Sequence, residues 1–182
     1  IKSKYNIQSK NVNYLKNLME LSSKDKTILI DNETTSYQLD QFTYKINDEF
    51  LKGINIKLIE NIKVPSKESN QLFFKDGFFD LKNNKYLTGE TEITLKKDIF
   101  NNDDNDPRLK GASSKSNNGI TTINKSIFTS CKKDKNCVPW QIQAEEITHD
   151  QNKKQLSYKD AIIKIYNVPV FYFPKFFHPD PS

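Results

Sequence analysis

The amino-acid sequence predicts an all-β protein, an antiparallel β-jellyroll or splayed β-sandwich built from repeated hairpins. Apolar and polar residues alternate in several runs, as in Trp140–Ala144, and this period of two is that of a strand with one buried face. Short polar turns separate these runs. The apolar content is low, 35% of residues, but 12% are aromatic, which favours thin sheets with one solvated face over a disordered chain.

The first half of the chain divides into short strands at its turn residues. The segment Asn11–Leu21 is predicted to be a hairpin that turns at Leu15, although its apolar spacing also permits one or two helical turns. The next strand changes its buried face between Leu39 and Phe42, which indicates a β-bulge. The strands expected in this half are Thr27–Asp31, Ser36–Ile46, Phe50–Ile59, Leu72–Leu81 and Tyr86–Leu95.

The second half begins with a polar segment, Ile99–Asn118, which is predicted to be an irregular surface loop. Its acids lack the D-x-D-x-D-G spacing of a calcium loop. Strands are expected at Ile120–Ser130, from Trp140 onward, and again through Ile165 after a turn at Asp150. The tail that begins at Val168 carries four prolines and five aromatic residues, so it is predicted to be an edge strand or an exit segment.

A degenerate repeat supports this architecture and says nothing about function. The repeat unit starts with a polar turn, has an apolar residue six positions after the turn begins, and has a third residue nine positions after it. An alternating strand follows each time, and the unit occurs three times. The three sets are Tyr44, Phe50 and Gly53; Asp80, Tyr86 and Gly89; and Asp150, Leu156 and Lys159.

The charge pattern argues against nucleic-acid binding. The net charge is +5, but it is carried by lysines, and Arg108 is the only arginine. Nucleic-acid readers use clustered arginine for bidentate contacts, whereas these lysines alternate with acids and asparagines in the turns. We therefore expect a solvated surface with lysines guarding the sheet edges, and no nucleic-acid partner.

The sequence also predicts a protein that is not an enzyme and uses no cofactor. His149 and Asp150 are adjacent on a strand, so their side chains point to opposite faces and form no dyad. Neither a G-x-S-x-G motif nor a phosphate-binding loop is present. His149 and His178 are not spaced with the cysteines as zinc ligands are, so no metal site is expected.

Two blocks carry a family resemblance. The C-terminal stretch contains P-W-Q-I-Q-A, I-T-H-D and Y-K-D-A, and ends in V-P-V-F-Y-F-P-K-F-F-H-P-D-P. It resembles the periplasmic OstA-like domain of the LptD family, the outer-membrane lipopolysaccharide-assembly proteins. The block N-D-P-R-L-K-G-A-S-S, which begins at Asn105, is similar to the alphaproteobacterial type of this family.

The resemblance implies a domain layout, a location and partners. Residues 1–167 would form a jellyroll that lacks its N-terminal part, and residues 168–182 would lead to an outer-membrane β-barrel. The domain would lie on the periplasmic side of the outer membrane. Its partners would be lipopolysaccharide, an LptA-like bridge protein joined by edge-strand addition, and an LptE-like lipoprotein plug inside the barrel.

The resemblance further implies that lipid acyl chains travel in the apolar interior. Each buried CH₂ contributes about 0.8 kcal/mol without directional contacts, which suits sliding. Residues that would line a lipid path and residues of a closed core lie on the same face of the sheet. The sequence therefore allows either role at each position. The predicted lipid-binding positions are Ile54, Ile56, Leu58, Ile93, Leu95, Ile142, Ala144, Ile147, Ile163, Ile165, Phe171 and Phe173.

The two cysteines, Cys131 and Cys137, lie in one short polar segment. In an oxidising periplasm we expect them as disulfides. The LptD family has disulfides that tie its jellyroll to its barrel. We predict a local bridge between Cys131 and Cys137, with pairing to other cysteines as the open alternative.

Two other functions fit part of the pattern. A free-standing bridge protein like LptA or LptC would use the same fold, but the proline-rich tail favours the barrel-attached form. A structural or carbohydrate-binding sandwich of the cell surface would present an aromatic platform on an exposed face. Trp140 is the only tryptophan, and most aromatic residues lie in apolar alternation, which disfavours that function.

Overall fold

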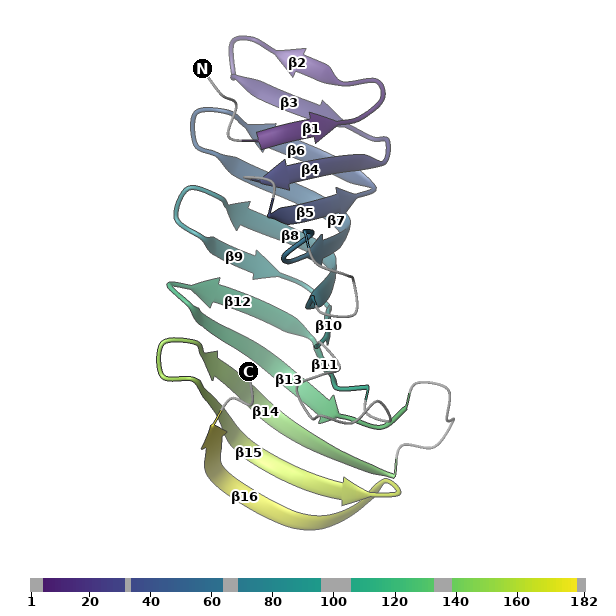
Figure 1. Cartoon of the computed structure of the whole chain (residues 1–182), viewed down its shortest axis with the longest axis vertical. Coiled ribbons are helices and arrows are strands. Elements are labelled where there is room, and N and C mark those ends of the chain that lie inside the picture. The colour runs from purple at the N-terminus through teal and green to yellow at the C-terminus, as the bar shows by residue number, and fades with distance from the viewer. Residues whose placement is uncertain (1–4, 32–33, 64–68, 96–105, 133–138, 180–182) are drawn as a thin grey trace.

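A computed structural model describes residues 5–31, 34–63, 69–95, 106–132 and 139–179. Within these ranges sixteen antiparallel strands join into one sheet, and no helix is present. The predicted all-β antiparallel fold is therefore confirmed. The strands stack like rungs along the long axis of the molecule, from the N-terminus at one end to β16 at the other (Figure 1).

The sheet folds on itself into two layers. Short strands belong to one layer each. The first layer contains β1 (Tyr5–Gln8), β4 (Thr27–Asp31), β5 (Thr35–Leu39), β10 (Thr91–Thr94) and β11 (Arg108–Gly111). The second contains β2 (Asn13–Leu15), β3 (Glu20–Ser23), β6 (Gln41–Lys45), β9 (Lys85–Thr88) and β12 (Ser113–Asn117).

Six long strands cross from one layer to the other and hold them together. Their bounds are β7 (Phe50–Ile59), β8 (Gln71–Asp80), β13 (Ile120–Thr129), β14 (Trp140–Asp150), β15 (Gln155–Ile165) and β16 (Val168–Pro179). Aromatic side chains of the two layers meet between them. Tyr37 of the first layer lies 5.5 Å from Phe79 of the second, and Tyr5 lies 5.9 Å from Tyr44, measured between ring centroids.

Each long strand bends at a pair of successive residues that both point outward. In β8 this pair is Lys75–Asp76, between the buried Phe74 and Gly77. The ladder skips a residue on each strand at this place, and the bend residues Asn55, Lys125 and Asp160 have φ near +50°. We call the line that joins these places the bend line; it is where the two layers meet.

Small side chains fill the inside of the bend line, because the layers converge there and leave little room. A Cβ on Gly53 would lie 2.2 Å from Leu39 Cδ2, and one on Gly111 would lie 2.2 Å from Ile123 Cγ2. The buried small residues of the bend line are Gly53, Gly77, Ser114, Ser126, Ala144 and Ala161.

The predicted hairpins are confirmed, including the one between β2 and β3. Four-residue turns close β2–β3, β6–β7, β8–β9 and β14–β15, and each ends in a residue with φ near +50°. These residues are Met19, Glu49, Asn84 and Lys154. The predicted change of face between Leu39 and Phe42 is found, but not as a β-bulge in one strand. The chain crosses the bend line at Asp40, between two separate strands, β5 and β6.

Three expectations need correction or refinement. The predicted loop Ile99–Asn118 is wrong where the structure describes it, since β11 and β12 occupy most of 108–117. Ile54 was expected inside, but it lies on the outer face and is 40% exposed. The tail 168–179 is an edge strand, as predicted, and it pairs with β15 in the same sheet as 1–167. Residues 180–182 lie outside the described ranges.

Candidate functional site

The apolar interior between the layers is the candidate site. Eleven of the twelve predicted lining positions face it; Ile54 does not. Five are buried core residues: Ile56, Leu58, Ile93, Ala144 and Ile147. Leu95 and Ile142 pack against that core, and Ile163 lies directly opposite Ile142. The remaining three, Ile165, Phe171 and Phe173, share this face but are 44%, 62% and 38% exposed.

The interior is closed in the middle of the stack, and its apolar side chains are exposed at the C-terminal end. Phe79 is 2% exposed, and its ring contacts those of Tyr37, Phe74 and Tyr86 at centroid distances of 5.5–5.9 Å. At the C-terminal end, Phe171 and Phe173 of the last strand are 62% and 38% exposed. We call the inward side chains of β16 the aromatic rim: Phe171, Phe173, Phe176 and His178.

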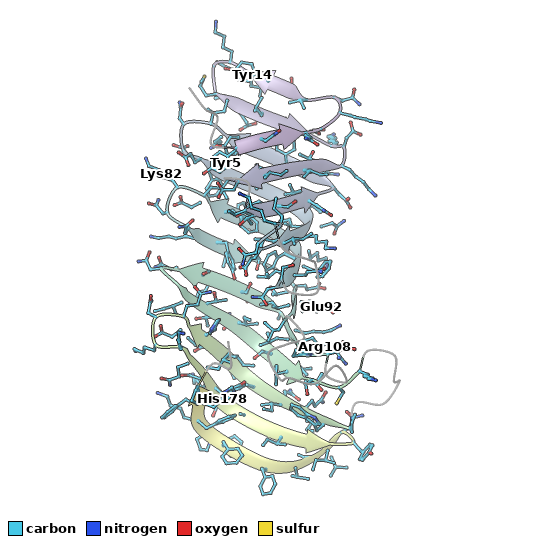
Figure 2. All side chains as sticks on the ribbon, viewed as in Figure 1. Tyr5, Tyr14, Lys82, Glu92, Arg108 and His178 are labelled. Atoms are coloured by element: carbon cyan, nitrogen blue, oxygen red, sulfur yellow. The ribbon has the colours of Figure 1, made fainter. Side chains whose placement is uncertain are left out.

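The aromatic rim is anchored to the core by Tyr158. The rings of Tyr158 and Phe176 are parallel, with centroids 4.4 Å apart. The Tyr158 hydroxyl lies 3.1 Å from His178 Nε2, and His178 Nδ1 lies 2.7 Å from the carbonyl oxygen of Pro179. A neutral imidazole that donates from Nδ1 and accepts at Nε2 satisfies both contacts. Figure 2 shows His178 near the C-terminal end of the stack.

Burial raises the pKa of the Tyr158 phenol to about 12. The side chain is 2% exposed, so the charged phenolate would lose its hydration. Tyr158 therefore stays neutral, and its hydroxyl donates a hydrogen bond to His178 Nε2. On the outer face, the Tyr172 hydroxyl donates to Asp160 Oδ1 at 2.8 Å, so hydrogen bonds hold β16 to β15 on both faces.

A buried polar cluster lies beside the interior at the bend line. Ser114 Oγ is 2.6 Å from Thr88 Oγ1 and 3.0 Å from Thr91 Oγ1. All three side chains are at most 4% exposed, and they satisfy one another. The polar sequence S-S-K-S therefore forms β12 because its serines fit the narrow bend and its backbone is paired on both sides.

Arg108 is a structural residue at the start of β11. It is 9% exposed, and its Nη1 donates to the carbonyl oxygens of Asp106 and Cys131. It thereby joins the segment before β11 to the one after β13. Arg108 stands out in the sequence because it is the only arginine, but no local pattern indicates this role.

We expect Arg108→Met to lower the free energy of unfolding by about 1–3 kcal/mol, because two carbonyl oxygens lose a charged donor. Lys110→Met is the matched control. Lys110 is on the same strand and pairs with Glu92 at 3.1 Å in an exposed ion pair, and loss of such a pair costs about 1 kcal/mol or less. Urea unfolding of both variants measures the difference; equal losses would contradict the role of Arg108.

The structure describes one of the two cysteines for which a disulfide is predicted. Cys131 is half-buried, and its Sγ lies 3.7 Å from the carbonyl oxygen of Trp140. Cys137 lies outside the described residues. The bridge between them stays a prediction.

Two outward phenylalanines bear on the carbohydrate alternative. Phe73 and Phe78 are 38% and 40% exposed on the outer faces of the two layers. The ammonium of Lys57 lies 5.4 Å from the Phe73 centroid, and that of Lys52 lies 5.4 Å from the Phe78 centroid. A lysine therefore covers each ring, and neither ring is a bare platform for a sugar.

The structure places no group of three metal-ligating side chains together among the residues it describes. His149 and Asp150 are neighbours on β14 and are both partly buried. Within the same ranges, no helix is long and apolar enough to cross a membrane.

No protein-family model matches the chain, and no curated protein matches it in sequence. The similarity to the LptD family therefore rests on the quoted sequence blocks alone. A proposal about function therefore depends on these blocks and on the geometry of the interior.

The aromatic rim could not be recognised as a unit from the sequence, although the signal for the bend is present there. Each long strand has two consecutive residues that break the alternation. Examples are Lys75–Asp76, Asn124–Lys125, Glu145–Glu146, Lys159–Asp160 and Pro174–Lys175. Strict alternation ignores such pairs and therefore places Ile54 on the wrong face.

Proposed function

We propose that this protein carries lipopolysaccharide on the periplasmic side of the outer membrane. Its apolar interior takes lipid acyl chains from a bridge protein and passes them toward a membrane barrel. The observation that carries the proposal is the aromatic rim. Phe171 and Phe173 continue the inner face of the sheet and are 62% and 38% exposed at the open end.

The rim has the chemistry of an acyl-chain site. Its phenylalanines offer apolar surface without hydrogen-bonding groups, and burying each CH₂ of a chain against them would contribute about 0.8 kcal/mol. In the closed part, the core side chains between Leu29 and Ile123 are at most 9% exposed. Passage through that part requires the two layers to separate, so the open end is where a chain resides at rest.

Edge strands at the opposite end support an LptA-like partner. Among the described residues β2 pairs only with β3, so the outer edge of β2 faces away from the sheet and can add another strand. Exposed apolar side chains surround β2, and Figure 2 shows Tyr14 at this end of the stack. They are Val12, Tyr14, Leu15 and Leu18. An LptE-like plug would bind the barrel, so that partner rests on the resemblance alone.

One observation favours a second candidate, the free-standing bridge protein. β16 is paired with β15 from Val168 to Pro179, as a final rung would be. A bridge protein would then pass lipid from one end of the stack to the other. A barrel encoded directly after Ser182 would decide for the first candidate.

Photo-crosslinking at neighbouring positions tests lipid carriage. Benzoylphenylalanine in place of Phe173 faces the interior, and the same residue in place of Tyr172 faces outward. With lipopolysaccharide, we expect a crosslinked adduct at position 173 and at least about tenfold less at position 172, because the acyl chains lie on one face. Equal yields at both positions, or none at 173 in a folded protein, would refute carriage in this interior.

A further inference from the structure

β16 is a long and largely apolar edge strand. It has 12 residues and, among the residues that the structure describes, pairs with β15 alone. Natural edges are commonly short, covered, charged or interrupted by proline; β16 has three prolines and one lysine, Lys175, and it still exposes apolar side chains on both faces. The exposed apolar side chains of β16 are Val168, Val170, Phe171, Tyr172, Phe173 and Phe177.

The faces of β16 alternate in a symmetric pattern about its bend. Phe173 and Phe176 face inward, opposite Ala161 and Tyr158, on either side of the bend at Pro174–Lys175. Further out, Tyr172 and Phe177 face outward, opposite Ile162 and Ser157. Phe171 and His178 then face inward again, opposite Ile163 and Leu156. The order of faces is therefore the same in both directions from the bend, with an aromatic ring at every step.

We propose that the protein forms a two-fold symmetric dimer in which two copies of β16 pair antiparallel, with the axis through the bend. In antiparallel pairing, opposite residues share a face. This register places Phe173 opposite Phe176 of the partner subunit, Tyr172 opposite the partner's Phe177, and Phe171 opposite the partner's His178. The bends of the two copies coincide, so each layer of one copy continues into a layer of the other and the two open ends meet. The dimer therefore goes with the free-standing candidate, because a barrel-attached protein needs this end open toward the barrel.

The sequence of β16 suits this register. The prolines, which lack an N–H, fall at the axis and near the ends, at positions 174, 169 and 179. The ladder hydrogen bonds would come from those alternate residues on each side of Pro174 that point their N–H and C=O groups away from β15. Lys175 is opposite the partner's Pro174 in this register, so no two lysines are directly opposed across the pair.

The opposite end of the molecule is a poorer match for β16. There β1 has 4 residues and β2 has 3, and the chain between them is not a strand. A head-to-tail contact would leave much of the 12-residue strand uncovered. A second β16 covers all of it, including the bend.

The mass of the protein in solution tests the dimer and is independent of lipid carriage. Sedimentation and light scattering without lipid should give a species of twice the 21.2 kDa chain mass at micromolar concentration. A 21.2 kDa species throughout the concentration range, or a ladder of growing oligomers from head-to-tail contact, would overturn the proposal.

Two double variants test the register. Tyr172→Lys with Phe177→Glu places opposite charges across the pair, and Tyr172→Lys with Phe177→Lys places like charges there. Both remove the same two rings, and circular dichroism checks that both fold. Because the pair occurs twice in the dimer, we expect the like-charge variant to dissociate about tenfold more readily than the opposite-charge one. Equal dissociation constants would overturn the register.

Discussion

Phe79→Ala is expected to lower the free energy of unfolding by about 3–5 kcal/mol, a large part of the stability of a domain of this size. Phe79 is 2% exposed and joins the two layers, because its ring contacts Tyr37 of β5 as well as Phe74 and Tyr86. Truncation leaves a cavity that the bent sheet cannot close without moving a layer. Urea or thermal unfolding measures the loss.

Phe78→Ala is the matched control, since it removes the same side chain from the adjacent position. Phe78 points outward, is 40% exposed and contacts Lys52 and Phe50. We expect a loss of about 1 kcal/mol or less, from a surface contact. If both variants lose the same stability, the assignment of inner and outer faces to β8 is wrong.

Stability is expected to fall steeply between pH 10 and pH 12. Burial raises the pKa of Tyr158 to about 12, and it also raises the pKa values of Tyr37 and Tyr86. A phenol whose folded pKa lies above its unfolded value of about 10 stabilises the fold fully below pH 10. That contribution is lost as the pH rises through the folded pKa. For Tyr158 alone it is about 2–3 kcal/mol.

Tyrosinate absorption measures this directly. The folded protein should show a group of phenols that ionise later than those of the same chain unfolded in urea, with unfolding beginning in the same pH range. Tyr158→Phe removes one of the late phenols and should reduce the loss of stability above pH 10. Superimposable titrations of folded and unfolded protein would show that these side chains are not buried.

The fold could be predicted from the sequence because its main signals are local. Alternation and polar turns define each hairpin without reference to distant residues, and the predicted turn at Leu15 and the change of face after Leu39 are both found. The interior could be predicted for the same reason. Once a strand has one apolar face, that face has to be buried.

The corrections come from properties that depend on distant partners. Ile54 and Ile56 lie on different faces because Asn55 adopts φ of 50° at the bend, which single-strand periodicity does not contain. The residues of β12 have weak strand preference, and they become a strand because β9 and β13 pair with both edges. The openness of the aromatic rim depends on the spatial neighbours of β16, which strand periodicity does not specify.

The stack of rungs has a consequence for how the molecule loses its structure. Each rung is paired only with the rungs next to it, so stability accumulates along one dimension, as in solenoid proteins. A strand in the middle of the stack can unfold only after a neighbouring strand has unfolded, whereas a terminal strand can unfold by itself. Unfolding therefore starts at the terminal strands β1, β2 and β16, which are also the strands that can most easily pair with another chain. The stack can likewise gain or lose a whole hairpin without changes to the other strands.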